Sequence, residues 1–482
     1  MNKIAHSLKW VFSTIVLRRV LSFLLFLYII RTFSRAEYGM YRQFMSITTA
    51  ISVFCLYSFG IFNIVEQTKK YFKLGLQFVI ISSALGSLVL FSLRYFFSAG
   101  EIGDFSYNSD LFYYILFGFW LVVPETLKRL ISSIHQLDMN FKLKSVAETT
   151  NIIVFCLLTL ALLFFDKKFY YYVIAFYIGG LVELIMLSYP IRKELITDLL
   201  ACLRLKYLTP LKNLLKEKFA FLSLTTVPTV INIFIADAPL LLFGFFYTAT
   251  DIGNYSAIAQ LIIIPVSFLT LSLSQVYFPV FSEAGIENLP SKILQYLKHV
   301  VIILWYPILI FGILLKYWSY LLLGNQDIAL ITAILVLLVP RTLFSLILNP
   351  LSCIPTILKK PEYELYWNLF SLSLIILMIF FLKNQEFLIM VSVYSLVTIF
   401  TLLCFTILIF KMTGMKLNLL YKWLGKGIIY NLPLFLVLFF VKYSNNFQVI
   451  SLLSVSALMS GAMLYIFEKE FILNAIKKFR SK

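Results

Sequence analysis

Charged residues are scarce in this chain of 482 residues. Asp, Glu, Lys and Arg together make up 13% of it, whereas hydrophobic residues make up 61%. A water-soluble domain carries about 25% charged residues. The chain therefore lacks the polar side chains that would cover its surface in water, and this scarcity excludes a soluble globular protein.

Residues that carry enzyme or metal chemistry are also few. The three histidines, His6, His135 and His299, lie far apart, and the five cysteines form no C-x-x-C pair. The chain has no phosphate-binding loop, no G-x-S-x-G elbow and no cluster of metal ligands. We therefore expect no disulfide, metal site or cofactor, and a transporter driven by gradients rather than an ATPase or hydrolase.

Long apolar runs are what the chain does contain. Each run approaches the roughly 20 residues that cross a bilayer as a helix, because backbone polar groups in lipid must be satisfied within the segment. These runs predict an all-α polytopic membrane protein with about fourteen transmembrane helices. The predicted segments are 8–30, 43–65, 76–97, 111–131, 146–165, 169–189, 219–247, 253–281, 298–316, 327–349, 362–383, 387–410, 428–443 and 448–467.

The positive charges indicate the orientation in the membrane. The first apolar run is too long for a cleaved signal peptide and is predicted to be the first transmembrane helix. Placing the N-terminus in the cytoplasm assigns every loop to one side of the membrane. The cytoplasmic side then collects 29 of the 41 Lys and Arg residues and the opposite side only 9. This asymmetry is typical of the positive-inside rule, so both termini are predicted to be cytoplasmic. The net charge of +18 therefore needs no nucleic-acid partner.

The longest predicted cytoplasmic loop divides the chain. It runs from Pro190 to Lys218, and its spaced leucines predict an amphipathic helix on the membrane surface. We expect an N-terminal six-helix half at 1–189, a basic connecting loop at 190–218, a C-terminal six-helix half at 219–410, and two further helices with a basic tail at 411–482.

A short motif occurs in both halves. Glu37-Tyr38-Gly39-Met40-Tyr41 and Asp251-Ile252-Gly253-Asn254-Tyr255 both read acidic-x-Gly-x-Tyr, 214 residues apart. Each opens the second helix of its half on the same membrane face, which favours duplication as a parallel repeat with substrate between the halves. The carboxylate suits a helix start, and the glycine is expected to permit a tight turn.

From Leu17 to Gln67 the chain resembles the polysaccharide-flippase (Wzx-type) family, part of the larger group that includes multidrug MATE exporters and the lipid II flippase. The matching residues are Arg19, Arg31, the Glu37–Tyr41 motif and Tyr57-Ser58-Phe59-Gly60-Ile61. The resemblance implies a MATE-like fold, and it makes Arg19 the counterpart of the family's arginine in the first helix. Fourteen segments exceed the twelve usual in that family, so the last two helices have no role implied by it.

Arginines inside the membrane are the candidate substrate-binding residues. Ionisable side chains there are costly and usually face a cavity or a partner. Arg18 and Arg19 lie near the middle of the first helix, where a guanidinium can bind pyrophosphate with two parallel hydrogen bonds. The alternative is a structural pairing with Glu125, Glu148 or Glu183. Two further arginines complete the candidate set: Arg341, inside the predicted helix 327–349, and Arg31, just after the first predicted helix.

Two carboxylates are candidates for ion coupling. Asp237 lies in an apolar segment that also contains Pro228 and Pro239, and prolines free backbone carbonyls that help to bind a cation or proton. The alternative for Asp237 is a salt bridge to Arg341. Glu66 lies beside Lys69 and Lys70, and its alternative is a solvated ion pair.

These features favour a flippase of the bacterial inner membrane, which moves an undecaprenyl-pyrophosphate-linked oligosaccharide from the cytoplasmic to the periplasmic leaflet. The polar glycan cannot cross about 30 Å of hydrocarbon unaided, so alternating access through a cationic cavity is expected. Membrane lipids, a proton or sodium ion and a polysaccharide polymerase are the further candidate partners. The alternatives are a multidrug or cation antiporter of the same fold and a membrane glycosyltransferase or polymerase, although two intramembrane arginines and the absence of a large external loop argue against them.

Overall fold

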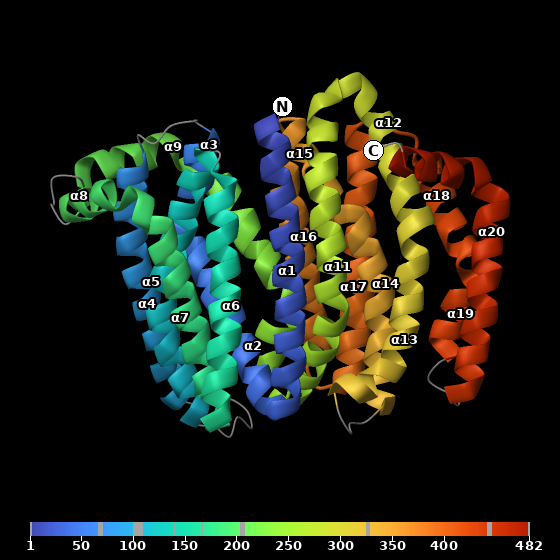
Figure 1. The fold of residues 1–482 in the computed structure, drawn as a ribbon, viewed down its shortest axis with the longest axis horizontal. Coiled ribbons are helices and arrows are strands. Elements are labelled where there is room, and N and C mark those ends of the chain that lie inside the picture. The colour runs from blue at the N-terminus through green and yellow to red at the C-terminus, as the bar shows by residue number, and fades with distance from the viewer. Residues whose placement is uncertain are drawn as a thin grey trace. The chain divides into compact units, whose positions relative to one another are not determined.

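The computed structural model describes residues 2–65, 71–99, 109–138, 140–165, 167–202, 208–323, 328–440 and 446–480. All regular secondary structure in these residues is helical, as Figure 1 shows. Seven of the helices are long and apolar enough to cross a membrane, or eight if one bent pair is a single span. The prediction of an all-α polytopic membrane protein is therefore confirmed, while the number fourteen stays a prediction.

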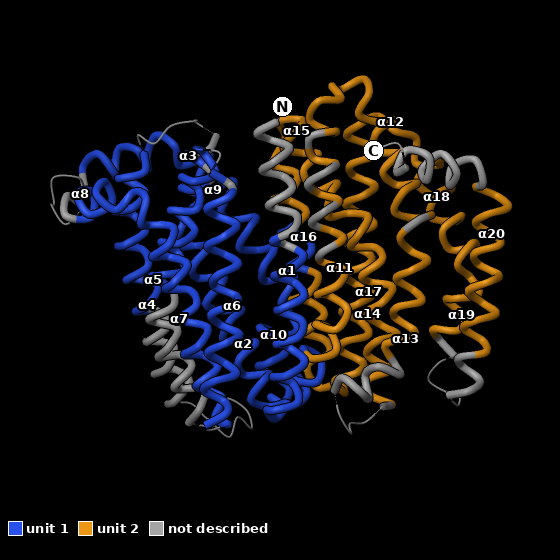
Figure 2. Tube along the Cα trace, in the orientation of Figure 1, with its two compact units in different colours: residues 1–256, 368–373 blue, residues 257–367, 374–482 orange. Residues whose placement is uncertain are grey.

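The chain forms two compact units (Figure 2). The first contains residues 1–256 and 368–373, and the second contains residues 257–367 and 374–482. The first unit extends beyond the predicted connecting loop because α9 (Leu208–Ala236) packs against α2 (Arg35–Leu56). The predicted division into two six-helix halves stays a prediction.

Helix pairs build the first unit. Apart from α2 and α9, its elements are α1 (Asn2–Thr32), α3 (Phe59–Val65), α4 (Phe72–Ala99), α5 (Ser109–Leu137), α6 (Phe141–Phe165), α7 (Phe169–Ser188), η1 (Tyr189–Ile191), α8 (Arg192–Cys202), α10 (Ala238–Leu241), η3 (Phe243–Phe245) and the start of α11 (Ala249–Glu283). α6 packs against α7 and α1, and α5 packs against α4, α2 and α7. This arrangement brings the charged residues of α1, α5, α6 and α7 together.

The predicted amphipathic segment after α7 forms α8 and the first part of α9. Its leucines pack against a buried cluster of apolar residues from α3, α4 and α5 that includes Phe59, Leu76 and Leu130. Leu211 is 5% exposed, and Leu195 and Leu215 contact the same cluster. The apolar face of this segment is therefore covered by the first unit.

The second unit is also helical. It holds the rest of α11 and α12 (Gly285–Lys298), η4 (His299–Leu304), α13 (Trp305–Leu323), α14 (Ile328–Leu351), α15 (Ile354–Ile357), α16 (Glu362–Leu382) without residues 368–373, α17 (Phe387–Met412), α18 (Leu417–Tyr430), α19 (Leu432–Phe440) and α20 (Asn446–Arg480). α14 packs against α13 and α17, and α13 also contacts α19 and α20.

Three segments that we predicted as unbroken helices are interrupted. The segment 43–65 breaks at Tyr57 and Ser58, whose φ angles of 45° and 54° are left-handed, and such residues cost of order 1–3 kcal/mol each. Hydroxyl groups of α9 hold this break, because Tyr57 bonds Ser223 at 2.7 Å and Ser58 bonds Thr226 at 2.9 Å. Hydropathy alone does not reveal such a break, because only two residues leave the helical conformation and the segment around them stays apolar.

The other two breaks lie at Asp237, between α9 and α10, and at Asn431, between α18 and α19. The Asn431 side chain donates to the carbonyl of Gly427 at 2.9 Å. The amide groups of Leu240 and Leu241 both donate to the Asp237 carbonyl at 2.9 Å. Each break therefore keeps most of its backbone groups satisfied within the apolar segment.

Candidate functional site

The two copies of the repeated motif begin their helices in the same way. At the start of α2, Glu37 N donates to Ser34 Oγ at 3.2 Å, and Ser34 N donates to the Glu37 carboxylate at 2.9 Å. At the start of α11, Asp251 N donates to Thr248 Oγ1 at 3.2 Å, and Thr248 N donates to the Asp251 carboxylate at 3.3 Å. Both are capping boxes, so the acidic residue of each motif satisfies otherwise unpaired amides.

The glycines of the motif have a different role from the predicted one. Neither Gly39 nor Gly253 has a positive φ, so the expected tight turn was wrong. A Cβ atom at Gly39 would overlap the carbonyl oxygen of Ala249, and one at Gly253 would overlap the carbonyl oxygen of Arg35. The two contacts are symmetric, because Ala249 lies four residues before Gly253 and Arg35 lies four residues before Gly39. The backbones of the two helix starts are therefore in direct contact.

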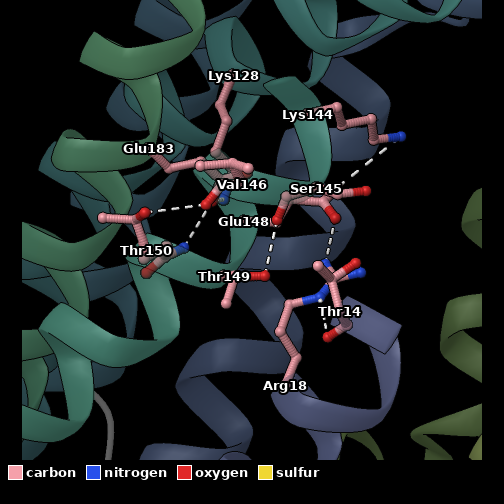
Figure 3. A network of polar contacts seen from close by, with 11 residues as sticks. Thr14, Arg18, Lys128, Lys144, Ser145, Val146, Glu148, Thr149, Thr150 and Glu183 are labelled. Atoms are coloured by element: carbon pink, nitrogen blue, oxygen red, sulfur yellow. Dashed lines mark hydrogen bonds and ion pairs between the residues drawn. The ribbon is translucent and has the colours of Figure 1, made fainter. Parts of the chain in front are cut away.

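Arg18 belongs to a polar network of α1 and α6 (Figure 3). Its guanidinium pairs with the carboxylate of Glu148 and also donates to the Thr14 carbonyl at 3.3 Å. Lys144, one turn before Glu148 on α6, lies 3.9 Å from the same carboxylate. Glu148 is therefore held by two cations, which is the structural pairing considered above for Arg18.

A second ion cluster joins α5 to α7. The Lys128 ammonium lies 2.6 Å from Glu125 and 3.2 Å from Glu183, and Arg129 Nε lies 3.1 Å from Glu125. Asn151 of α6 donates to Glu183 at 2.5 Å. The two clusters contain four cations and three carboxylates, so together they carry a positive excess of one charge.

Arg19 increases this excess. Its side chain is half-buried, and it makes no ion pair or hydrogen bond within the part of the chain that the structure describes. Arg31 lies in the last turn of α1, where its side chain is exposed. The structure thus places the three arginines of α1 differently: among the described residues, Arg18 is paired with Glu148, whereas Arg19 is half-buried beside it and Arg31 is exposed. The substrate-binding roles of all three stay predictions.

Asp237 lies at the break between α9 and α10, where Ser46 of α2 donates to its carboxylate. Arg42, also on α2, lies within electrostatic range of Asp237 and of the hydroxyl groups of Tyr38 and Tyr41. The Arg42 Nε atom is enclosed and has no hydrogen-bond acceptor among the described residues. Arg42 is therefore an enclosed arginine beside the candidate coupling carboxylate.

Our sequence interpretation missed Arg42 because it began the second helix at residue 43. The signal was present in the sequence, since Ser34 and Glu37 have the spacing of a capping box. With the helix starting at Arg35, Arg42 lies about two turns inside it.

The remaining candidates lie elsewhere. Arg341 of α14 belongs to the second unit, where it donates to Tyr394 Oη at 2.9 Å and lies 4.6 Å above that ring. The predicted salt bridge between Asp237 and Arg341 would join residues of the two units and stays a prediction. Glu66 lies outside the described residues, so its proposed ion-coupling role also stays a prediction.

Solved structures with the same fold are membrane transporters. The lipid II flippase MurJ in an inward closed conformation superimposes with a TM-score of 0.67 at 15% identity, covering 96% of this chain and 99% of that one. A mutant of the Vibrio cholerae MATE transporter VcmN gives 0.56 at 13% identity, with 87% and 99% covered. A transporter of the MOP superfamily from Pyrococcus furiosus gives 0.52 at 12% identity, with 86% and 96% covered.

The sequence comparison identifies the family. No curated protein matches the chain. The family model described as polysaccharide biosynthesis protein matches residues 5–284, which is more than half of the chain. The match includes α1 with its arginines, the first copy of the repeated motif and the second copy at the start of α11. The predicted resemblance is thereby confirmed, and the chain is a multi-span membrane protein that belongs to the polysaccharide biosynthesis protein family.

Proposed function

We propose that this protein is a flippase of the bacterial inner membrane that moves an undecaprenyl-pyrophosphate-linked oligosaccharide from the cytoplasmic to the periplasmic leaflet. The family membership associates the chain with polysaccharide biosynthesis, and the shared fold is that of membrane transporters. Alternating access lets the polar glycan and pyrophosphate avoid the hydrocarbon while the polyprenyl tail stays in lipid.

The observation that carries this proposal is the positive excess of the two ion clusters together with Arg19. Arg18, Lys144, Lys128 and Arg129 already satisfy the three carboxylates of the two clusters. Arg19 adds a cation with no described partner. A half-buried arginine without a counter-ion is unfavourable inside a membrane protein, so an anionic substrate group supplies the missing partner.

Pyrophosphate has the chemistry for this role. A guanidinium forms two parallel, charge-assisted hydrogen bonds with phosphate oxygens, and such bonds are about twice as strong as neutral ones. The same positive charge disfavours a cationic drug, so it opposes the multidrug-antiporter alternative. The membrane potential, negative inside, also favours outward movement of each substrate charge by about 2.3 kcal/mol per 100 mV.

The proposal includes ion coupling at Asp237, but only under a condition that concerns Arg42. A free carboxylate binds a proton or sodium ion, whereas Asp237 already accepts from Ser46 and lies near the positive charge of Arg42. We therefore expect coupling at Asp237 only if Arg42 moves away during the transport cycle. Without such movement, the membrane potential alone drives export.

Adjacent arginines supply a matched test. Wild type, Arg19→Ala, Arg19→Lys and Arg18→Ala are reconstituted in vesicles, and flipping of a fluorescent pyrophosphate-linked glycan is followed together with thermal unfolding. Arg19→Ala should reduce substrate affinity roughly ten- to a hundredfold, the loss expected for a charge-assisted hydrogen bond, with near-normal unfolding. Arg19→Lys should lose less, because it keeps the charge but not the planar geometry. Normal flipping by Arg19→Ala would reject the site.

A further inference from the structure

An open apolar groove lies within the first unit at the bend of α9. Its volume is about 570 Å³, which lies in the range of small-ligand sites. Residues of α2, α4 and α9, with Tyr57 just beyond α2, line it: Phe54, Tyr57, Phe78, Ser82, Leu215, Lys216 and Phe219. The two parts of α9, Thr209–Phe219 and Phe221–Ala236, meet there at 75°, so the first part turns away from the second.

The walls of this groove suit a hydrocarbon chain. Both polar side chains on the α2 and α4 walls are already bonded, because Tyr57 Oη meets Ser223 Oγ at 2.7 Å and Ser82 Oγ donates to the Cys55 carbonyl at 2.7 Å. Phe54 and Phe219 are 57% and 61% exposed at its edges. These walls therefore offer a sugar or other polar ligand only two hydroxyl groups that are already engaged, so the chemistry favours an apolar ligand.

Lys216 gives the groove one positive charge. It is exposed on the first part of α9 and makes no ion pair within the described residues. The neighbouring Glu217 is paired with Lys218 at 3.4 Å. A cation on the edge of an apolar groove matches a ligand with one anionic group at the end of a hydrocarbon chain.

We propose that this groove is a binding site for an anionic phospholipid. One acyl chain lies along the rings of Phe54, Phe78 and Phe219, and the Lys216 ammonium binds the phosphate. The basic connecting segment before α9 is predicted to be cytoplasmic. It supports an anionic membrane lipid as the ligand, because such lipids gather beside basic segments at the cytoplasmic surface. The site is separate from the substrate site proposed at Arg19, and it does not depend on the transported molecule.

The test measures lipid binding by the purified full chain. Native mass spectrometry in detergent follows titration with dioleoylphosphatidylglycerol or dioleoylphosphatidylcholine, for wild type, Lys216→Gln, Lys212→Gln and Phe219→Ala. Lys212 is the matched control, because it is exposed one turn earlier on the same helix but does not line the groove. Because all three side chains are exposed, the variants should fold normally, and thermal unfolding checks this.

We expect one phosphatidylglycerol to bind more tightly than phosphatidylcholine. Lys216→Gln should weaken phosphatidylglycerol binding about tenfold and leave phosphatidylcholine binding unchanged, since only the charge-assisted contact is lost. Lys212→Gln should change neither, and Phe219→Ala should weaken both. Equal losses from the two lysine variants would overturn the proposal in favour of diffuse surface attraction. Displacement of phosphatidylglycerol by an equal concentration of undecaprenyl phosphate would overturn it in favour of the substrate's own lipid.

Discussion

At the scale of single residues, Arg18 and Arg19 show how little sequence position says about a charged side chain. Both are arginines near the middle of α1, and consecutive helix positions point about 100° apart. Arg18 therefore meets Glu148 and Thr14, whereas Arg19 meets no carboxylate among the described residues. The same residue type is paired with a carboxylate at one position and has no carboxylate partner among the described residues at the next.

Arg18→Ala should lower the stability of the folded protein more than Arg19→Ala does. Its removal leaves Glu148 with only Lys144, 3.9 Å away. Breaking a buried pair costs about 3–5 kcal/mol, but these side chains are 23% and 22% exposed, so we expect about 1–2 kcal/mol after solvent screening. Thermal unfolding of the purified proteins measures the difference. An equal or larger loss for Arg19→Ala would assign Arg19 a structural role.

Asp237 has two possible arginine partners, and double-mutant cycles distinguish them. We expect Asp237→Asn and Arg42→Gln to be coupled by about 0.5–3 kcal/mol, the range for residues that interact directly. Asp237→Asn and Arg341→Gln should be additive within about 0.5 kcal/mol, because Arg341 bonds Tyr394. Unfolding of each single and double variant supplies the energies. Strong coupling to Arg341 alone would support the predicted salt bridge instead.

At the scale of helices, the repeated motif acts through its backbone. The acidic residue closes a capping box in each copy, and the glycine removes the side chain where α2 and α11 meet. A five-residue pattern thus specifies both where the helix starts and what approaches it. This contact explains why the motif contains glycine without any left-handed backbone angle.

Gly253→Ala should therefore destabilise the protein. The added methyl group would overlap the carbonyl oxygen of Arg35, which belongs to the backbone and moves only with its helix, and overpacking of this kind costs about 1–3 kcal/mol. Gly180→Ala on α7 is the control, because nothing lies within 4 Å of its Cβ position. It should stabilise its helix by about 0.5–1 kcal/mol. Similar unfolding midpoints for the two variants would contradict the close approach.

At the scale of the whole molecule, membrane orientation determines where each site acts. Both proposals require the connecting segment between α7 and α9 to lie on the cytoplasmic side, as the distribution of Lys and Arg predicts. Substrate would then enter from the leaflet where its lipid carrier is loaded, and the groove at Lys216 would face the leaflet rich in anionic lipid.

Cysteine labelling in intact cells tests this orientation. In a variant without its natural cysteines, Asn213→Cys on α9 should resist a membrane-impermeant maleimide until the cells are opened. Gln385→Cys should react at once, since it lies between α16 and α17 on the predicted periplasmic side. Both positions are exposed, so reactivity reports the side of the membrane. Immediate labelling at position 213 would invert the topology.

The amino-acid sequence by itself determined the class of the protein and most of its helices. Apolar length and the shortage of charge require membrane-spanning helices because these are properties of each segment alone. The repeated motif and the helix starts also depend on short stretches of sequence. Even the helix start that we missed before Arg42 could have been predicted from the spacing of Ser34 and Glu37.

Only the tertiary structure decided which charges meet. The pairing of Arg18 with Glu148 and the position of Arg42 near Asp237 join residues more than a hundred positions apart. The contact between Gly39 and the α11 backbone and the break at Tyr57 held by α9 are also long-range. Such contacts depend on the rotation of each helix about its own axis, which packing against neighbouring helices sets and hydropathy does not record.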